Sequence, residues 1–93
     1  MKEFDESLNT AVFTTKYVMQ DKHTITFVSH DLEDGAWQFL SNDQPENNEG
    51  MAMLVSLKEI IDQDPSILDV SDLPIGYIAT RQSKKDNWER QKE

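Results

Sequence analysis

The segment Met51–Gln63, M-A-M-L-V-S-L-K-E-I-I-D-Q, contains a strand-like run followed directly by a helix-like run. Its first five residues are all apolar, which is typical of a buried strand. The next four, S-L-K-E, match the capping box, in which the serine hydroxyl accepts a hydrogen bond from the amide three residues on and the glutamate reaches back. The segment therefore predicts a strand over Met51–Val55 that passes into a helix over Leu57–Gln63.

On the C-terminal side, the sequence predicts an end to this helix, a short helical turn and a last strand. Pro65 cannot continue the helix, and Asp64 can cap a new turn over Pro65–Leu68 with proline in the first position. Pro74–Thr80, P-I-G-Y-I-A-T, has the composition of a strand.

The C-terminal residues 82–93 differ from the rest of the chain in composition. After Arg81 the only apolar side chain is Trp88. We expect these residues to form a polar tail that is a short helix or disordered. Trp88 either folds back onto the domain or contacts a partner.

On the N-terminal side, three further runs predict strands. Thr10–Met19 is rich in β-branched and aromatic residues, Thr24–Ser29 alternates polar and apolar side chains, and Ala36–Leu40 places Trp37 and Phe39 on one face. Because short links join the three runs, an antiparallel meander is the simplest topology for them.

The predicted fold class is therefore α+β, with a small antiparallel sheet of about four to five strands packed against one or two short helices. We expect an N-terminal segment over residues 1–9, a single domain over 10–81 and the tail over 82–93. No apolar run approaches the roughly 20 residues that span a bilayer, and the acidic N-terminus lacks a secretory signal. We expect a cytoplasmic protein with no membrane partner.

The charge is large and uneven. The 93 residues include 18 acidic and 9 basic side chains, which gives a formal net charge of −9, and there is no cysteine. Between Lys22 and Arg81 the sequence has eleven acidic residues and a single basic one, Lys58. This composition excludes disulfides and thiol chemistry, and it argues against nucleic acid as a partner. The acidic residues between Lys22 and Arg81 either keep the protein soluble or attract a basic partner.

The sequence offers little material for catalysis or metal binding. The two histidines, His23 and His30, flank one predicted strand without a metal-ligand spacing, so we expect them at the surface or at a sheet edge. Asp31, Glu33 and Asp34 lack the EF-hand pattern, and a solvated turn around Gly35 is the simpler interpretation. We predict a protein that is not an enzyme and that has no cofactor.

Several short motifs occur in an order that resembles a small bacterial family. They are D-G-A-W-Q-F-L-S-N-D at 34–43, Q-D-P-S-I at 63–67, L-P-I-G-Y at 73–77 and the Thr15-Lys16 turn. This order is similar to DUF2185, the Imm33-like immunity protein domain, over Ala11–Arg81. One departure is Ala36, where the family commonly has glycine before the tryptophan, and it leaves the geometry of this turn open.

The resemblance implies an α+β fold and an immunity protein of a bacterial toxin system, which binds a cognate toxin in the cytoplasm and blocks it. We expect two acidic loops, Asp31–Asp34 and Asp43–Glu49, to contact a basic toxin, with Trp37 either in the core or at the rim of the interface. The alternative is a self-associating regulatory or scaffold domain, such as a homodimer, without a toxin partner. The candidate partner-binding residues are Asp31, Glu33, Asp34, Trp37, Asp43, Glu46 and Glu49.

Overall fold

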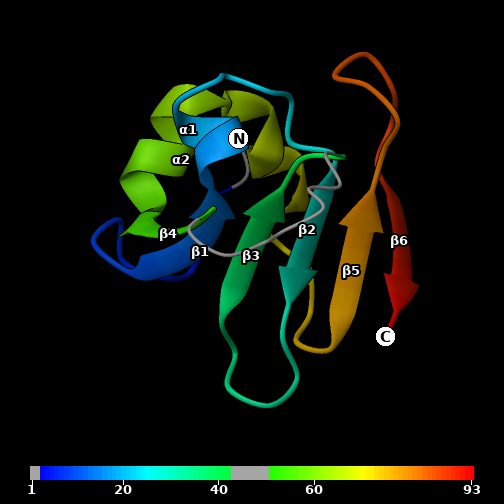
Figure 1. Cartoon of the computed structure of the whole chain (residues 1–93). Coiled ribbons are helices and arrows are strands. Elements are labelled where there is room, and N and C mark those ends of the chain that lie inside the picture. The colour runs from blue at the N-terminus through cyan, green and yellow to red at the C-terminus, as the bar shows by residue number, and fades with distance from the viewer. Residues whose placement is uncertain (1–2, 43–50) are drawn as a thin grey trace.

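A computed structural model describes residues 3–42 and 51–93. It belongs to the α+β class, as predicted, with a single six-stranded sheet and short helices (Figure 1). In chain order the elements are β1 (Ala11–Thr15), α1 (Lys16–Met19), β2 (Phe27–His30), β3 (Trp37–Leu40), β4 (Ala52–Ser56), α2 (Leu57–Gln63), the 3-10 helix η1 (Pro65–Val70), β5 (Tyr77–Thr80) and β6 (Glu89–Lys92).

The sheet is mixed and its strand order is β4-β1-β3-β2-β5-β6. β1 and β3 are parallel, with Phe13 opposite Gln38, and every other neighbouring pair is antiparallel. The predicted antiparallel sheet of four to five strands is therefore wrong in strand number and in direction, and so is the meander of the first three runs. β3 lies between β1 and β2, and the Thr14 hydroxyl donates across the parallel pair to the Phe39 carbonyl at 2.7 Å.

The early end of β1 explains this topology. The run Thr10–Met19 does not continue as one strand, because the Thr15 hydroxyl accepts from the Val18 amide at 3.4 Å and caps the single-turn helix α1. The chain turns away there and reaches β2 by way of a turn in which Lys22 has a φ of 60°. β2 therefore does not return alongside β1.

The helices near the centre of the chain begin where the sequence predicts. α2 starts after Ser56, whose hydroxyl accepts from the Glu59 amide at 3.2 Å, and it ends at Gln63. Asp64 caps η1 by accepting from the Ser66 amide at 3.1 Å. Serine and aspartate side chains satisfy amides that would otherwise lack partners at a helix start.

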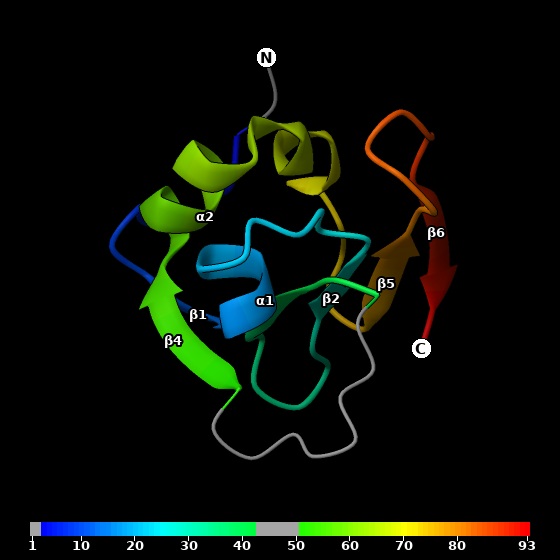
Figure 2. The ribbon, with the colours of Figure 1, turned by 45° about the horizontal axis from the view of Figure 1, so that its top comes forward.

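The hydrophobic core lies between α2, η1 and one face of the sheet, which we call the covered face (Figure 2). Alternate residues of a strand point to opposite faces, so each strand contributes every second side chain to the core. The core residues of the sheet are Val12, Val28, Trp37, Phe39, Val55 and Ala79, and those of the two helices are Leu57, Ile60, Ile67 and Val70.

Trp37 belongs to this core, so of the two positions expected for it the structure has the core and not the rim of an interface. Its side chain is 1% exposed, and the Phe4 ring packs edge-on against it with a centroid distance of 4.9 Å. Its indole nitrogen Nε1 donates to Glu6 Oε2 at 2.7 Å. The N-terminal segment therefore packs against the core through an aromatic ring and a carboxylate.

His30 is buried rather than at the surface, because it shares the covered face with Trp37. It is 9% exposed, its ring stacks on Trp37 with a centroid distance of 4.0 Å, and its Nδ1 donates to the Leu73 carbonyl at 2.8 Å. His23 is exposed, as predicted, and its ring stacks on Tyr17 with a centroid distance of 5.9 Å.

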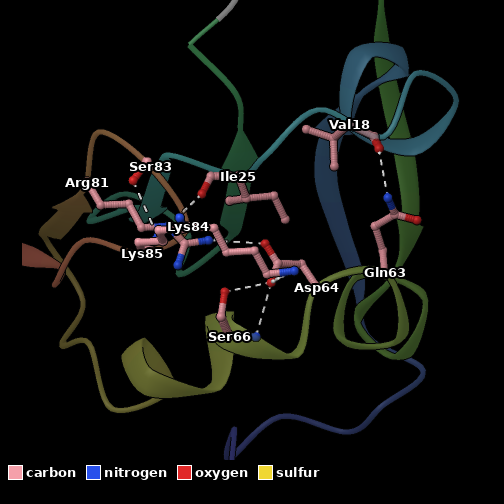
Figure 3. Close-up of polar contacts among 9 residues, drawn as sticks. All are labelled: Val18, Ile25, Gln63, Asp64, Ser66, Arg81, Ser83, Lys84 and Lys85. Atoms are coloured by element: carbon pink, nitrogen blue, oxygen red, sulfur yellow. Dashed lines mark hydrogen bonds and ion pairs between the residues drawn. The ribbon is translucent and has the colours of Figure 1, made fainter.

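A buried ion pair joins the helices to the end of β5 (Figure 3). Arg81 Nη2 lies 3.1 Å from Asp64 Oδ2, and Arg81 Nε donates to the Ile25 carbonyl at 2.9 Å. Lys84 Nζ reaches the other carboxylate oxygen of Asp64 at 3.8 Å. The Asp64 carboxylate thus caps η1 and neutralises a buried guanidinium at the same time.

The C-terminal residues form strand β6, so the expectation of a helix or disorder is wrong. β6 pairs with β5 from Tyr77 opposite Lys92 to Thr80 opposite Glu89. Backbone pairing needs no apolar side chain, which is why composition did not indicate this strand. Trp88 folds back, and its ring lies 4.1 Å from the guanidinium carbon of Arg81.

Candidate partner-binding face

The side chains on the second face of the sheet point away from the core; we call this face the open face. Phe13 points to this face because its neighbours Val12 and Thr14 point to the core. Phe13 is 45% exposed, and its register partner Leu54 on β4 is 61% exposed. The two side chains form an exposed apolar pair at the centre of β1 and β4.

A groove of about 490 Å³ lies beside Phe13. We call it the open-face groove. Strands β1 and β3 contribute Phe13, Gln38 and Leu40 to its lining, and α1 contributes Tyr17. Asp31 and Asp34, from the loop between β2 and β3, also line it. The groove therefore combines two aromatic rings with two carboxyl groups.

Neutral hydrogen-bond donors hold the two carboxyl groups in place. Asp31 Oδ1 accepts from the Ser29 hydroxyl at 3.0 Å, and Asp31 Oδ2 accepts from Gln38 Nε2 at 2.8 Å. Asp34 Oδ1 accepts from the Ala36 amide at 2.9 Å, which closes the tight turn at Gly35. Gly35 has a φ of 71°, so it supplies the positive backbone angle in this turn.

No basic side chain neutralises these carboxyl groups within residues 3–42 and 51–93. Ion pairs in the described residues include those of Asp62, Asp64 and Asp72, and neither Asp31 nor Asp34 takes part in one. The carboxyl groups of Asp31 and Asp34 therefore give the groove on the open face a negative charge.

Exposed apolar side chains also flank the acidic loop. Leu32, inside the loop, and Ile75, just before β5, are both more than half exposed. A Cβ at Gly76 would lie 3.3 Å from Leu32 Cδ1, and Gly76 has a φ of 88°, so only glycine suits this position. The loop thus has a defined position against the start of β5.

The structure brings together some of the predicted site residues and separates others. Asp31 and Asp34 share the groove, whereas Glu33 is exposed in the same loop and does not line it. Trp37 faces the core. Asp43, Glu46 and Glu49 lie outside the described residues.

Sequence reasoning missed Phe13, Gln38 and Leu54. A signal was present, because Val12 and Phe13 are consecutive apolar residues in one predicted strand. A strand with one solvated face normally alternates, so an apolar pair indicates that both faces carry apolar side chains.

The described residues contain no group of three or more histidine, aspartate or glutamate side chains that could hold a metal ion. None of their helices is long and apolar enough to cross a membrane. Comparisons with protein-family models, with curated proteins and with solved structures gave no significant match to this chain.

Proposed function

We propose that this chain is a non-enzymatic protein-binding domain that acts as an immunity protein, binding a cognate bacterial toxin and neutralising it. The observation that carries the proposal is the open face, where the exposed pair Phe13 and Leu54 lies on the same side of the sheet as an acidic groove. Apolar side chains surrounded by polar ones are typical of protein interfaces.

The charge distribution supports a basic partner. Neither Asp31 nor Asp34 forms an ion pair within the described residues, and Glu33 adds a third negative charge at the loop surface. An acidic surface accelerates encounter with a basic protein and raises the salt dependence of association. Toxin domains that act on nucleic acid are commonly basic, because they must bind phosphate.

The motifs of the sequence support a toxin as the particular partner. The order of the Trp37, Asp64-Pro65 and Leu73-Pro74 motifs resembles the immunity family. Two of these motifs have structural tasks, since Trp37 lies in the core and Asp64 caps η1. Part of the motif pattern is therefore explained by the fold, and the toxin partner is inferred from the resemblance together with the open face.

A non-enzymatic role is supported by the groove lining. Neither His23 nor His30 lines the open-face groove, and its polar groups are carboxyl, amide and hydroxyl groups. Acid–base catalysis most often uses histidine, or a carboxyl group whose pKa is shifted by burial.

The proposal is tested with the product of the adjacent gene that most resembles a toxin. We expect the two proteins to co-purify as a 1:1 complex and bacterial growth to recover when both are expressed. The affinity should fall as the salt concentration is raised from roughly 50 to 500 mM, because salt screens the attraction between the acidic face and a basic toxin. If no neighbouring gene product binds and none inhibits growth, the proposal is wrong.

A self-associating scaffold domain is the second candidate, and the β4 edge favours it. β4 lies at one edge of the sheet and carries no charged residue over Ala52–Ser56, whereas β6 at the other edge carries Glu89, Arg90 and Lys92. Uncharged edge strands can pair with another chain. Light scattering over a range of concentrations decides between the two, because a dimer without any toxin partner favours self-association.

A further inference from the structure

The open-face groove has two chemically different parts. Phe13, Tyr17 and Leu40 supply aromatic and aliphatic walls, while Asp31 and Asp34 supply carboxyl groups. Gln38 connects the parts, because it is the register partner of Phe13 and donates to Asp31. A ligand that fills the groove therefore meets an apolar wall and an anionic one together.

The carboxyl groups retain capacity to accept hydrogen bonds. Asp34 uses only Oδ1, for the Ala36 amide, and each oxygen of Asp31 accepts one hydrogen bond from a neutral donor. A carboxylate oxygen has two acceptor positions. Two carboxylates that form no ion pair within the described residues repel an anion and favour a cation with several donors.

We propose that the open-face groove binds an arginine side chain of the partner protein. A guanidinium group has five N–H donors in one plane, stacks on aromatic rings and pairs with carboxylates through two parallel hydrogen bonds. Its aliphatic stem packs along apolar walls such as Phe13 and Leu40. This inference rests on the proposed function, because it names the contact by which a basic toxin is recognised.

The first experiment needs no toxin. The ¹⁵N-labelled protein is titrated with N-acetyl-arginine amide, and with N-acetyl-citrulline amide as the neutral analogue of the same shape. We expect saturable amide shifts at Phe13, Asp31 and Gln38 with the arginine compound, and binding at least about tenfold weaker with citrulline, since the charge-assisted bonds are lost. Equal shifts for both compounds, or shifts spread over all acidic residues without saturation, would overturn the inference.

The second experiment uses matched variants. Asp31→Asn keeps the shape and removes one charge from the groove, while Asp86→Asn removes one charge from the loop between β5 and β6, at the other end of the sheet (Figure 1). We expect Asp31→Asn to weaken binding of the arginine compound about tenfold and Asp86→Asn to change it less than about twofold. Asp34→Asn, at an exposed position, gives the same test if Asp31→Asn does not fold.

The outcomes for the groove and for the function are distinguishable. If the arginine compound binds but no toxin does, the groove stands and the proposed function fails. If a toxin binds the wild type and the two groove variants, Asp31→Asn and Asp34→Asn, equally well, the function stands and arginine recognition by the groove is wrong.

Discussion

The two faces of the sheet are formed by the same strands but differ in the side chains that they carry and in how exposed those side chains are. On β1, Val12 is fully buried against the helices, whereas its neighbour Phe13 is exposed on the open face. On β3, Trp37 and Phe39 fill the core while Gln38 lines the groove. Consecutive residues thus divide between the core and the proposed partner-binding face. Substitutions on the covered face should therefore affect stability, and those on the open face should affect binding.

The largest effect is expected for Phe39→Ala on the covered face. Phe39 is fully buried at the centre of the core, and removing a buried phenylalanine costs about 3–5 kcal/mol. Urea unfolding followed by tryptophan fluorescence measures the loss, which is a large part of the total stability of a domain of this size. A loss below about 1 kcal/mol would contradict the core described above.

A comparable loss is expected for Asp64→Ala, which breaks the buried ion pair. Arg81 would remain buried without its carboxylate, and uncompensated buried charges cost about 3–5 kcal/mol. The matched control is Asp62→Ala on the exposed side of α2. Its hydrogen bond to Lys58 raises the pKa of that lysine, but both side chains are in solvent and their loss should change stability little. Equal effects of the two substitutions would contradict the structural role of Asp64.

A smaller effect is expected for Trp88→Ala at the C-terminal hairpin. The ring covers the Arg81 guanidinium at 4.1 Å, and such contacts contribute about 0.5–2 kcal/mol. Trp88→Phe retains a ring and should recover part of the loss. Thermal unfolding followed by circular dichroism compares the three proteins, and identical midpoints would show that the contact does not stabilise the fold.

The smallest stability effect, and the largest binding effect, is expected for Phe13→Ala on the open face. Because the side chain is half exposed, its loss should cost about 1 kcal/mol or less in urea unfolding. Calorimetric titration with the partner should show at least about a tenfold loss of affinity, as for an aromatic interface residue. A variant that is strongly destabilised but binds normally would reverse the proposed roles of the two faces.

The elements that the sequence predicted correctly are those that depend on neighbours along the chain. α2 and η1 begin directly after Ser56 and Asp64 because a capping side chain bonds an amide two or three residues on. Strand partners depend on distant residues. The parallel pairing of β1 with β3 required the chain to turn at Thr15, and a cap within a β-branched run is not visible as a break.

The same distinction applies to the candidate site. Asp31 and Asp34 lie in one short loop, so their sequence proximity indicated that they would act together. Phe13 and Gln38 reach the groove only through the register of two strands. The burial of Trp37 and His30 also follows from strand pairing. The two residues are opposite each other in the β2–β3 pair, and both side chains point to the face that meets the helices.

The position of β1 has a consequence for the order in which the chain folds. β2 and β3 are joined by residues 31–36, and β5 and β6 by residues 81–88, so each pair can form from contacts that are local in sequence. β1 pairs instead with β3 and with β4, through residues as distant as Val12 and Val55. Closing such long loops is slow because the entropy is lost before the contacts form. The hairpins are therefore expected first, and the insertion of β1 between β3 and β4 becomes the step that sets the folding rate.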